Sequence, residues 1–200
     1  MHFFSNKRRA LLTATVAGLL SVTLAACSKS ELPFQGNDIS GTGLGRDLGM
    51  VDPSGKTRSL ADYKGKVVVA FFGFTHCPDV CPTAMAQLAQ AMTLLKDDAD
   101  KVQVIMITVD PERDTPEILG KYVQAFNPGF TGLTGSAEQL KKTAQSFKAY
   151  YAKSPGKTPG EYSMDHGSSF YILDQDGEAR VLLRGDASAE AIASDIKLLL

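Results

Sequence analysis

Continuous apolar runs and turn residues divide the chain into predicted strands. Residues 66–74 carry a continuous apolar, β-branched and aromatic run after Lys66, and residues 102–109 are of the same kind apart from Gln103, which is typical of strands buried on both faces of a sheet. Residues 130–136 predict a third, weaker strand. Turn signals at the centre of residues 48–60 and of residues 168–185 predict two β-hairpins, the second around an Asp-Gly pair.

Four other segments carry apolar residues at helical spacing. Pro82 suits the first turn of one helix, and Thr115 followed by Pro116 is typical of the start of another. Ser136 is the expected cap of the third helix. The helices are predicted from residue 82 onward, at 115–126, at 136–151 and at 188–200. The order of strands and helices predicts an α/β fold, with a mixed sheet flanked by helices.

The first 26 residues have the plan of an export signal. They contain no acidic residue, and three basic residues from Lys7 precede a long uncharged run. Residues 24–27, Leu-Ala-Ala-Cys, resemble the lipobox of bacterial lipoproteins, in which the cysteine is lipidated. We expect a lipoprotein signal at 1–26, with Cys27 lipidated and the protein facing the periplasm or cell exterior. An uncleaved anchor is the alternative, because about 17 apolar residues is the lower limit for a membrane span.

Removal of 26 of the 200 residues leaves 174, enough for one domain with a sizeable core. Residues 27–45 are rich in small polar residues and lack hydrophobic periodicity, which predicts a flexible tether before a domain at 46–200. Beyond the signal, 18 basic side chains oppose 22 acidic ones, for a net charge of −4. No basic run remains, which argues against nucleic acid and against electrostatic membrane binding.

Cys77 and Cys81 are the chemically distinctive residues of the predicted domain. They lie in the stretch FFGFTHCPDVCPT, where the first central strand runs into a helix. Functional sites of α/β folds lie at the carboxyl ends of strands, and a helix N-terminus lowers thiol pKa values. A disulfide, a redox catalyst and a metal site all remain open. A disulfide closing only five residues would add little stability.

Three motifs together resemble the SCO/SenC family: GFTHCPDVCPT, TVDPERDTP and YSMDHGSSFYILD. They occur in the family's order, and the resemblance runs from about residue 45 to 200. It implies a thioredoxin-like fold with an N-terminal hairpin, and a role in copper delivery to cytochrome c oxidase. It also implies one copper ion bound by Cys77, Cys81 and His166. Thiolates select copper(I), and imidazole suits copper in either oxidation state, so the chemistry agrees.

His166 follows a Pro/Gly-rich segment, residues 154–162, that is predicted to be a mobile loop. Asp79 and Asp110 are interpreted as contacts to a partner or to the surroundings of the copper, with loop solvation and strand termination as the ordinary alternatives. Arg113 shares the sheet edge of Asp110. Three weaker candidates are His76 as a tuning or surface residue, Met85 as a core residue, and Met164.

The sequence favours a membrane-tethered copper chaperone that delivers copper to, or prepares, the copper-bearing subunit of a respiratory cytochrome c oxidase. A periplasmic copper donor and a thiol reductant are further expected partners. The main alternative is a thiol–disulfide oxidoreductase, in which Cys77 and Cys81 keep the target cysteines reduced. A thiol peroxidase is the third hypothesis. His166 discriminates between the first two, because copper ligation requires it and thiol exchange does not.

Overall fold

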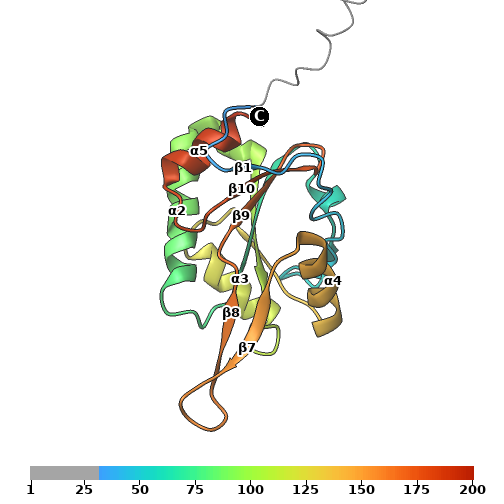
Figure 1. The fold of residues 1–200 in the computed structure, drawn as a ribbon, viewed down its shortest axis with the longest axis vertical. Helices are drawn as coiled ribbons and strands as arrows, with labels where there is room; N and C mark the ends of the chain where they lie inside the picture. Colours follow the sequence, from blue (N-terminus) through green and yellow to red (C-terminus); the bar gives the residue numbers. More distant parts are fainter. Residues whose placement is uncertain (1–31) are drawn as a thin grey trace, which may run out of the picture. The chain divides into compact units, whose positions relative to one another are not determined.

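The computed structural model describes residues 32–200, of which Phe34–Leu200 form one compact unit. A six-stranded mixed sheet, in the order β1-β10-β9-β4-β5-β6, lies at the centre of this unit (Figure 1). Strands β4, β5 and β6 are parallel, whereas β9 is antiparallel to β4. The strands of this sheet are β1 Asn37–Asp38, β4 Val67–Gly73, β5 Val102–Thr108, β6 Thr131–Leu133, β9 Phe170–Leu173 and β10 Ala179–Leu183.

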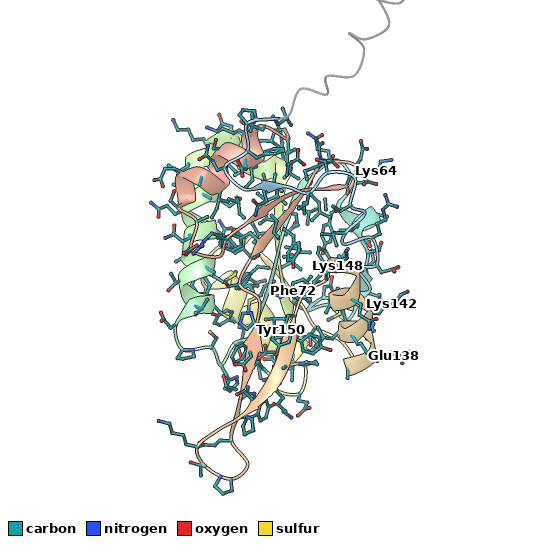
Figure 2. The ribbon with its side chains drawn as sticks, in the orientation of Figure 1. Lys64, Phe72, Glu138, Lys142, Lys148 and Tyr150 are labelled. Carbon is teal, nitrogen blue, oxygen red and sulfur yellow. The ribbon has the colours of Figure 1, made fainter. Side chains whose placement is uncertain are left out.

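Strand β4 is buried along its whole length, as its continuous apolar run predicts. Successive side chains of a strand point to opposite faces of the sheet. Phe71 packs against Phe170 on one side, with ring centroids 5.5 Å apart. Phe72, labelled in Figure 2, packs against Phe147 at 5.4 Å. The two central strands therefore form the core between helices on both faces.

The four predicted helices are present, together with the short 3-10 helices η2 Leu60–Tyr63 and η3 Lys96–Lys101. They are α2 Val80–Leu95, α3 Pro116–Gln124, α4 Ala137–Phe147 and α5 Ala189–Lys197. Thr115 and Ser136 cap α3 and α4 as predicted, each accepting a hydrogen bond from a backbone N–H three residues later. Helices α2 and α5 pack together, and α4 lies on the other side of the sheet (Figure 1). Among residues 32–200, no helix has the length and apolar character needed to cross a membrane.

The predicted N-terminal hairpin is confirmed as β2 Met50–Val51 and β3 Thr57–Arg58. Strand β1, by contrast, lies within residues 27–45, which were predicted to be a tether. Its edge of the sheet is held by the Asp195 carboxylate, which accepts hydrogen bonds from the backbone N–H groups of Gln35 at 2.7 Å and Gly36 at 2.9 Å. The compact unit therefore begins within the predicted tether. Hydrophobic periodicity could not reveal this, because the segment is attached through its backbone.

The largest difference from the sequence-based prediction is a β-hairpin of β7 Tyr151–Pro155 and β8 Tyr162–His166. The predicted helix at 136–151 ends earlier than expected, and the predicted Pro/Gly loop at 154–162 is shorter, because β7 and β8 occupy its two ends. Helix α4 ends at Phe147 because Lys148 adopts a left-handed conformation, with φ of 52°. The chain then pairs with itself, and the loop is confined to the hairpin tip. In Figure 1 the hairpin projects from the body of the compact unit.

Candidate metal centre

Cys77 and Cys81 lie at the junction between β4 and α2, as the sequence predicts. Cys77 precedes the helix and Cys81 is in its first turn, so that both sulfurs are on one side of the helix start. The backbone N–H of Cys81 donates a hydrogen bond to Cys77 Sγ at 3.4 Å. Both cysteines are free thiols; Cys77 is partly exposed and Cys81 is fully buried. The pair thus combines an accessible sulfur with an inaccessible one.

Gly73, the last residue of β4, lets the cysteine turn approach the sheet. A Cβ atom at this position would lie 2.7 Å from the Phe71 ring and 3.1 Å from Cys81 Sγ. A glycine within a strand is typical of such close contacts. No role was predicted for Gly73 from the sequence, although a glycine in an otherwise bulky strand was the available signal.

Burial raises the pKa of the Cys81 thiol far above its ordinary value. A hydrogen bond with the Phe74 backbone opposes this effect, whereas Cys77 and Asp114 add to it. The predicted lowering of the thiol pKa is therefore wrong for Cys81, because burial is the largest influence on this thiol and raises its pKa. A cation bound at the sulfur would compensate the buried negative charge and favour the thiolate.

His166, at the end of β8, completes a three-residue group. Its Nε2 atom lies 3.5 Å from Cys81 Sγ. Its Nδ1 atom lies 2.9 Å from the Gly167 carbonyl oxygen, an acceptor, which assigns the proton to Nδ1 and leaves the Nε2 lone pair facing the sulfur. The donor atoms of Cys77, Cys81 and His166 all lie within 4.8 Å of one another. This group could hold one metal ion.

Aromatic side chains position the imidazole, and a cleft gives access to it. The His166 ring makes edge-to-face contacts with Phe74, at a centroid distance of 5.7 Å, and with Phe71 at 6.3 Å. A cleft of about 300 Å³ is lined by Cys77 and His166, and also by Met164. The centre is therefore covered on its sheet side and open where Cys77 and His166 meet the cleft.

Three other candidates lie outside the Cys-Cys-His group. Asp79 is exposed at the start of α2, and its side chain makes no capping hydrogen bond there. His76 is exposed, with Nδ1 3.1 Å from the Thr75 hydroxyl. Met85 is fully buried in α2, consistent with its interpretation as a core residue. The functional roles considered for Asp79 and His76 stay predictions.

Asp110 contacts the hairpin that carries His166, and not the three donor atoms themselves. Its side chain is only 2% exposed and forms an ion pair with Arg113. It also accepts a hydrogen bond from the Tyr162 hydroxyl at 2.9 Å. Cys27 lies outside the described residues, so its lipidation stays a prediction.

Asp114 and Thr75 support the cysteine turn and were missed by the sequence analysis. The fully buried Asp114 carboxylate accepts hydrogen bonds from the Thr75 backbone N–H at 3.1 Å and from its hydroxyl at 2.5 Å. It accepts a third from the Thr108 hydroxyl at 2.6 Å. These bonds join the ends of β4 and β5 to the turn that leads to Cys77. Their signal was an acidic residue placed directly before a helix cap, in the motif that also contains Asp110.

The mixed sheet and the strand-end cysteines define a thioredoxin-like protein with a Cys-Cys-His group that could hold one metal ion. Residues 38–200 match the family described as SCO1/SenC. The chain therefore belongs to the SCO1/SenC family, which confirms the resemblance noted in its motifs.

Relatives of this family include the mitochondrial SCO2 homologue of Bos taurus, which is 37% identical over 199 residues, covering 96% of this chain and 74% of that protein. The chain spans between about half and three quarters of the length of such mitochondrial relatives. The structure of Bradyrhizobium japonicum ScoI with copper bound is similar with a TM-score of 0.72 and 38% identity, covering 78% of this chain and 99% of that one.

A third similar structure is that of BsSco, described as a member of the Sco family of cytochrome c oxidase assembly proteins in which a disulfide switch was identified. Its TM-score is 0.63 at 30% identity, covering 80% of this chain and 94% of that one.

Proposed function

We propose that this protein binds one copper ion through Cys77, Cys81 and His166 and serves the assembly of a copper site in cytochrome c oxidase. The observation that carries the proposal is the convergence, within 4.8 Å, of two thiols and an imidazole from distant parts of the chain. Thiolate and imidazole together suit copper. The copper-bound ScoI structure and the description of BsSco support the same metal and the same assembly process.

Delivery of the ion, as opposed to its storage, fits the accessibility of the centre. Three protein donors leave a coordination position free for a ligand of the acceptor protein. The cleft beside Cys77 and His166 provides the approach. We infer that the acceptor is the copper-bearing subunit of the oxidase, which would take over the ion as its own ligands replace those of the chaperone.

The proposed place of action is a membrane surface facing the periplasm or cell exterior, with Cys27 as the lipid anchor. The proposal rests on the lipobox-like residues 24–27 and the basic and uncharged segments before them. Substitution Cys27→Ala should move the protein from the membrane fraction to the soluble fraction. A Cys27→Ala protein that stays with the membranes would support the uncleaved anchor instead.

Thiol–disulfide exchange is a second candidate, favoured by the unequal burial of the two free thiols. The Cys77 thiolate would attack a disulfide of the target, forming a mixed disulfide and releasing one target thiolate. Cys81 would then displace the second target sulfur, leaving a Cys77–Cys81 disulfide and a reduced target. A separate thiol reductant would have to restore the pair.

Oxidase assembly in cells distinguishes the two candidates. If copper delivery is the function, cells with His166→Ala should assemble as little oxidase as cells with Cys77→Ala. If exchange is the function, His166→Ala should retain most oxidase activity, because both thiols remain. The comparison is made at equal protein level and ordinary copper supply, and near-normal activity of His166→Ala would overturn the delivery proposal.

A further inference from the structure

The hairpin that carries His166 depends on side-chain contacts for its position. Within residues 32–200, β7 and β8 form a separate two-stranded sheet and pair only with each other. An isolated two-stranded hairpin is marginally stable in water. Because neither strand of this hairpin is paired with the central sheet, the short connection from His166 to β9 is supplemented by side-chain contacts in setting the location of His166 beside Cys81.

Tyr162, at the start of β8, makes several of these contacts. Its hydroxyl donates a hydrogen bond to the Asp110 carboxylate at 2.9 Å, and its carbonyl oxygen accepts one from Arg113 Nη1 at 3.2 Å. Two cations contact its ring: the Arg113 guanidinium carbon and Lys153 Nζ, the latter from β7 of the same hairpin, each lie 3.9 Å from the ring centroid. Cation–π contacts of this kind stabilise a fixed ring position.

Tyr162 and His166 share one face of β8. Side chains alternate along a strand, so residues two and four apart point the same way. The pattern of burial follows this rule: Tyr162, Met164 and His166 are buried or half-buried, whereas Ser163 and Asp165 are exposed. Anchoring Tyr162 on the body therefore fixes the face that β8 presents and the depth at which His166 lies.

Asp110 and Arg113, which contact Tyr162 from outside the hairpin, are held in place by bonds that do not involve the hairpin. The Asp110 backbone N–H donates to the Thr108 hydroxyl at 2.9 Å, and the Asp110 carbonyl accepts from the N–H groups of Arg113 and Asp114. Asp110 and Arg113 are also ion-paired with each other. The acceptor Asp110 and the cation Arg113 are thus already in place at the carboxyl end of β5, where Tyr162 contacts them.

We infer that Tyr162 is a positioning residue of the metal centre, because its contacts with Asp110 and Arg113 dock the hairpin and hold His166 Nε2 beside Cys81. The inference rests on the proposed function, since it assigns Tyr162 a role at the same centre. It also gives Asp110 and Arg113 a task that their place in the sequence did not reveal. Loss of the contacts of Tyr162 with Asp110 and Arg113 would move the His166 imidazole away from Cys81 and leave the two cysteines in place.

The matched control for Tyr162 is Tyr150, which directly precedes the same hairpin. Its side chain is 65% exposed, and it is labelled in Figure 2. Substitution Tyr162→Leu removes the hydroxyl and the aromatic ring, Tyr162→Phe removes the hydroxyl alone, and Tyr150→Leu makes the same chemical change without touching Asp110 or Arg113. Circular dichroism of each purified full chain verifies that the sheet and helices are retained.

Amide hydrogen exchange of the reduced, metal-free protein measures docking directly. We expect Tyr162→Leu to accelerate exchange in β7 and β8 by about tenfold while the amides of β4 keep their protection. Tyr162→Phe should have a smaller effect and Tyr150→Leu none. Unchanged exchange in Tyr162→Leu would overturn the inference, as would equal acceleration throughout the central sheet.

Copper(I) affinity, measured by competition with a chromogenic chelator, then tests whether Tyr162 acts through His166. Tyr162→Leu should weaken binding about 10–100-fold in the otherwise unchanged protein, and should have no further effect in a His166→Ala background. Equal losses in both backgrounds would show that Tyr162 acts on the cysteines or on general stability, and would contradict the inference. If the unaltered protein binds no copper, the proposed function fails, whereas the exchange experiment still decides whether Tyr162 docks the hairpin.

Discussion

The two halves of the candidate centre are built in different ways. Cys77 and Cys81 lie at a strand–helix junction where β4 is paired on both sides and Cys81 is fully buried. His166 is the last residue of β8, at the base of a two-stranded hairpin whose tip projects from the compact unit. The sulfur pair is therefore positioned by the central sheet, whereas the nitrogen donor comes from a hairpin outside that sheet.

This difference suits a protein that must hold an ion and also surrender it. Elements with few buried contacts open more readily than core strands do. Loss of the imidazole would weaken copper binding while the thiols retained the ion, so that a ligand of the acceptor could enter. Cys77 and Cys81 would then retain the ion while His166 moves away from it.

The largest expected effect separates the two halves by copper affinity. Cys81→Ala should weaken copper(I) binding more than His166→Ala does, because it leaves a single thiolate beside the imidazole, and thiolates are the donors that select copper(I). His166→Ala should lower the copper affinity by at least roughly 10–100-fold. That is the usual loss when a residue supporting a metal ligand is removed, and removal of the ligand itself should weaken binding at least as much. Met85→Leu, a volume-conserving change in the buried part of α2, serves as the control and should leave the affinity unchanged. Equal affinities of Cys81→Ala and the unaltered protein would contradict the account.

The second effect sharpens the contrast within the cysteine half. Iodoacetamide should modify Cys77 at least about 100-fold faster than Cys81 at neutral pH, because Cys81 is buried and its pKa is raised. Peptide mass spectrometry of the reduced, metal-free protein at short reaction times measures the two rates. In concentrated denaturant the rates should become similar. Faster modification of Cys81 in the folded protein would refute the assigned burial.

A third prediction concerns the support of the buried sulfur. Gly73→Ala should lower the free energy of unfolding by about 1–3 kcal/mol, since the added methyl group meets the Phe71 ring and Cys81 Sγ. The matched control is Gly49→Ala, where the added Cβ has nothing within 4 Å. Chemical denaturation of the metal-free proteins gives both values. An unchanged stability of Gly73→Ala would show that the junction is looser than described.

The smallest expected effect lies in the turn that leads to Cys77. Thr75→Val removes one of the three hydrogen bonds accepted by the Asp114 carboxylate and should cost about 1 kcal/mol of unfolding free energy. The exposed Thr57 of β3 offers the control Thr57→Val, which should change stability by less. If the same denaturation experiment gave equal losses of unfolding free energy for the two variants, the hydrogen bond between Thr75 and Asp114 would not stabilise the site.

The same contrast explains what the sequence could predict. The apolar runs of β4 and β5 predict these core strands, and Thr115 and Ser136 mark helix starts. The α/β fold and the position of the cysteines were therefore predictable from the sequence. The β7–β8 hairpin was not, because its strands are exposed on one side and the loop between them is rich in Pro and Gly. The roles of Gly73 and Asp114 depend on contacts between distant segments, which no local pattern encodes.

Copper-edge X-ray absorption of the reduced protein, loaded with one equivalent of copper(I), tests the central claim most directly. We expect one bound copper per chain with two sulfur neighbours and one nitrogen neighbour. In His166→Ala the nitrogen neighbour should be lost while both sulfurs remain. A centre with fewer than two sulfurs, an undiminished nitrogen contribution in His166→Ala, or two tightly bound coppers per chain would contradict the assignment of Cys77, Cys81 and His166 as a single copper site.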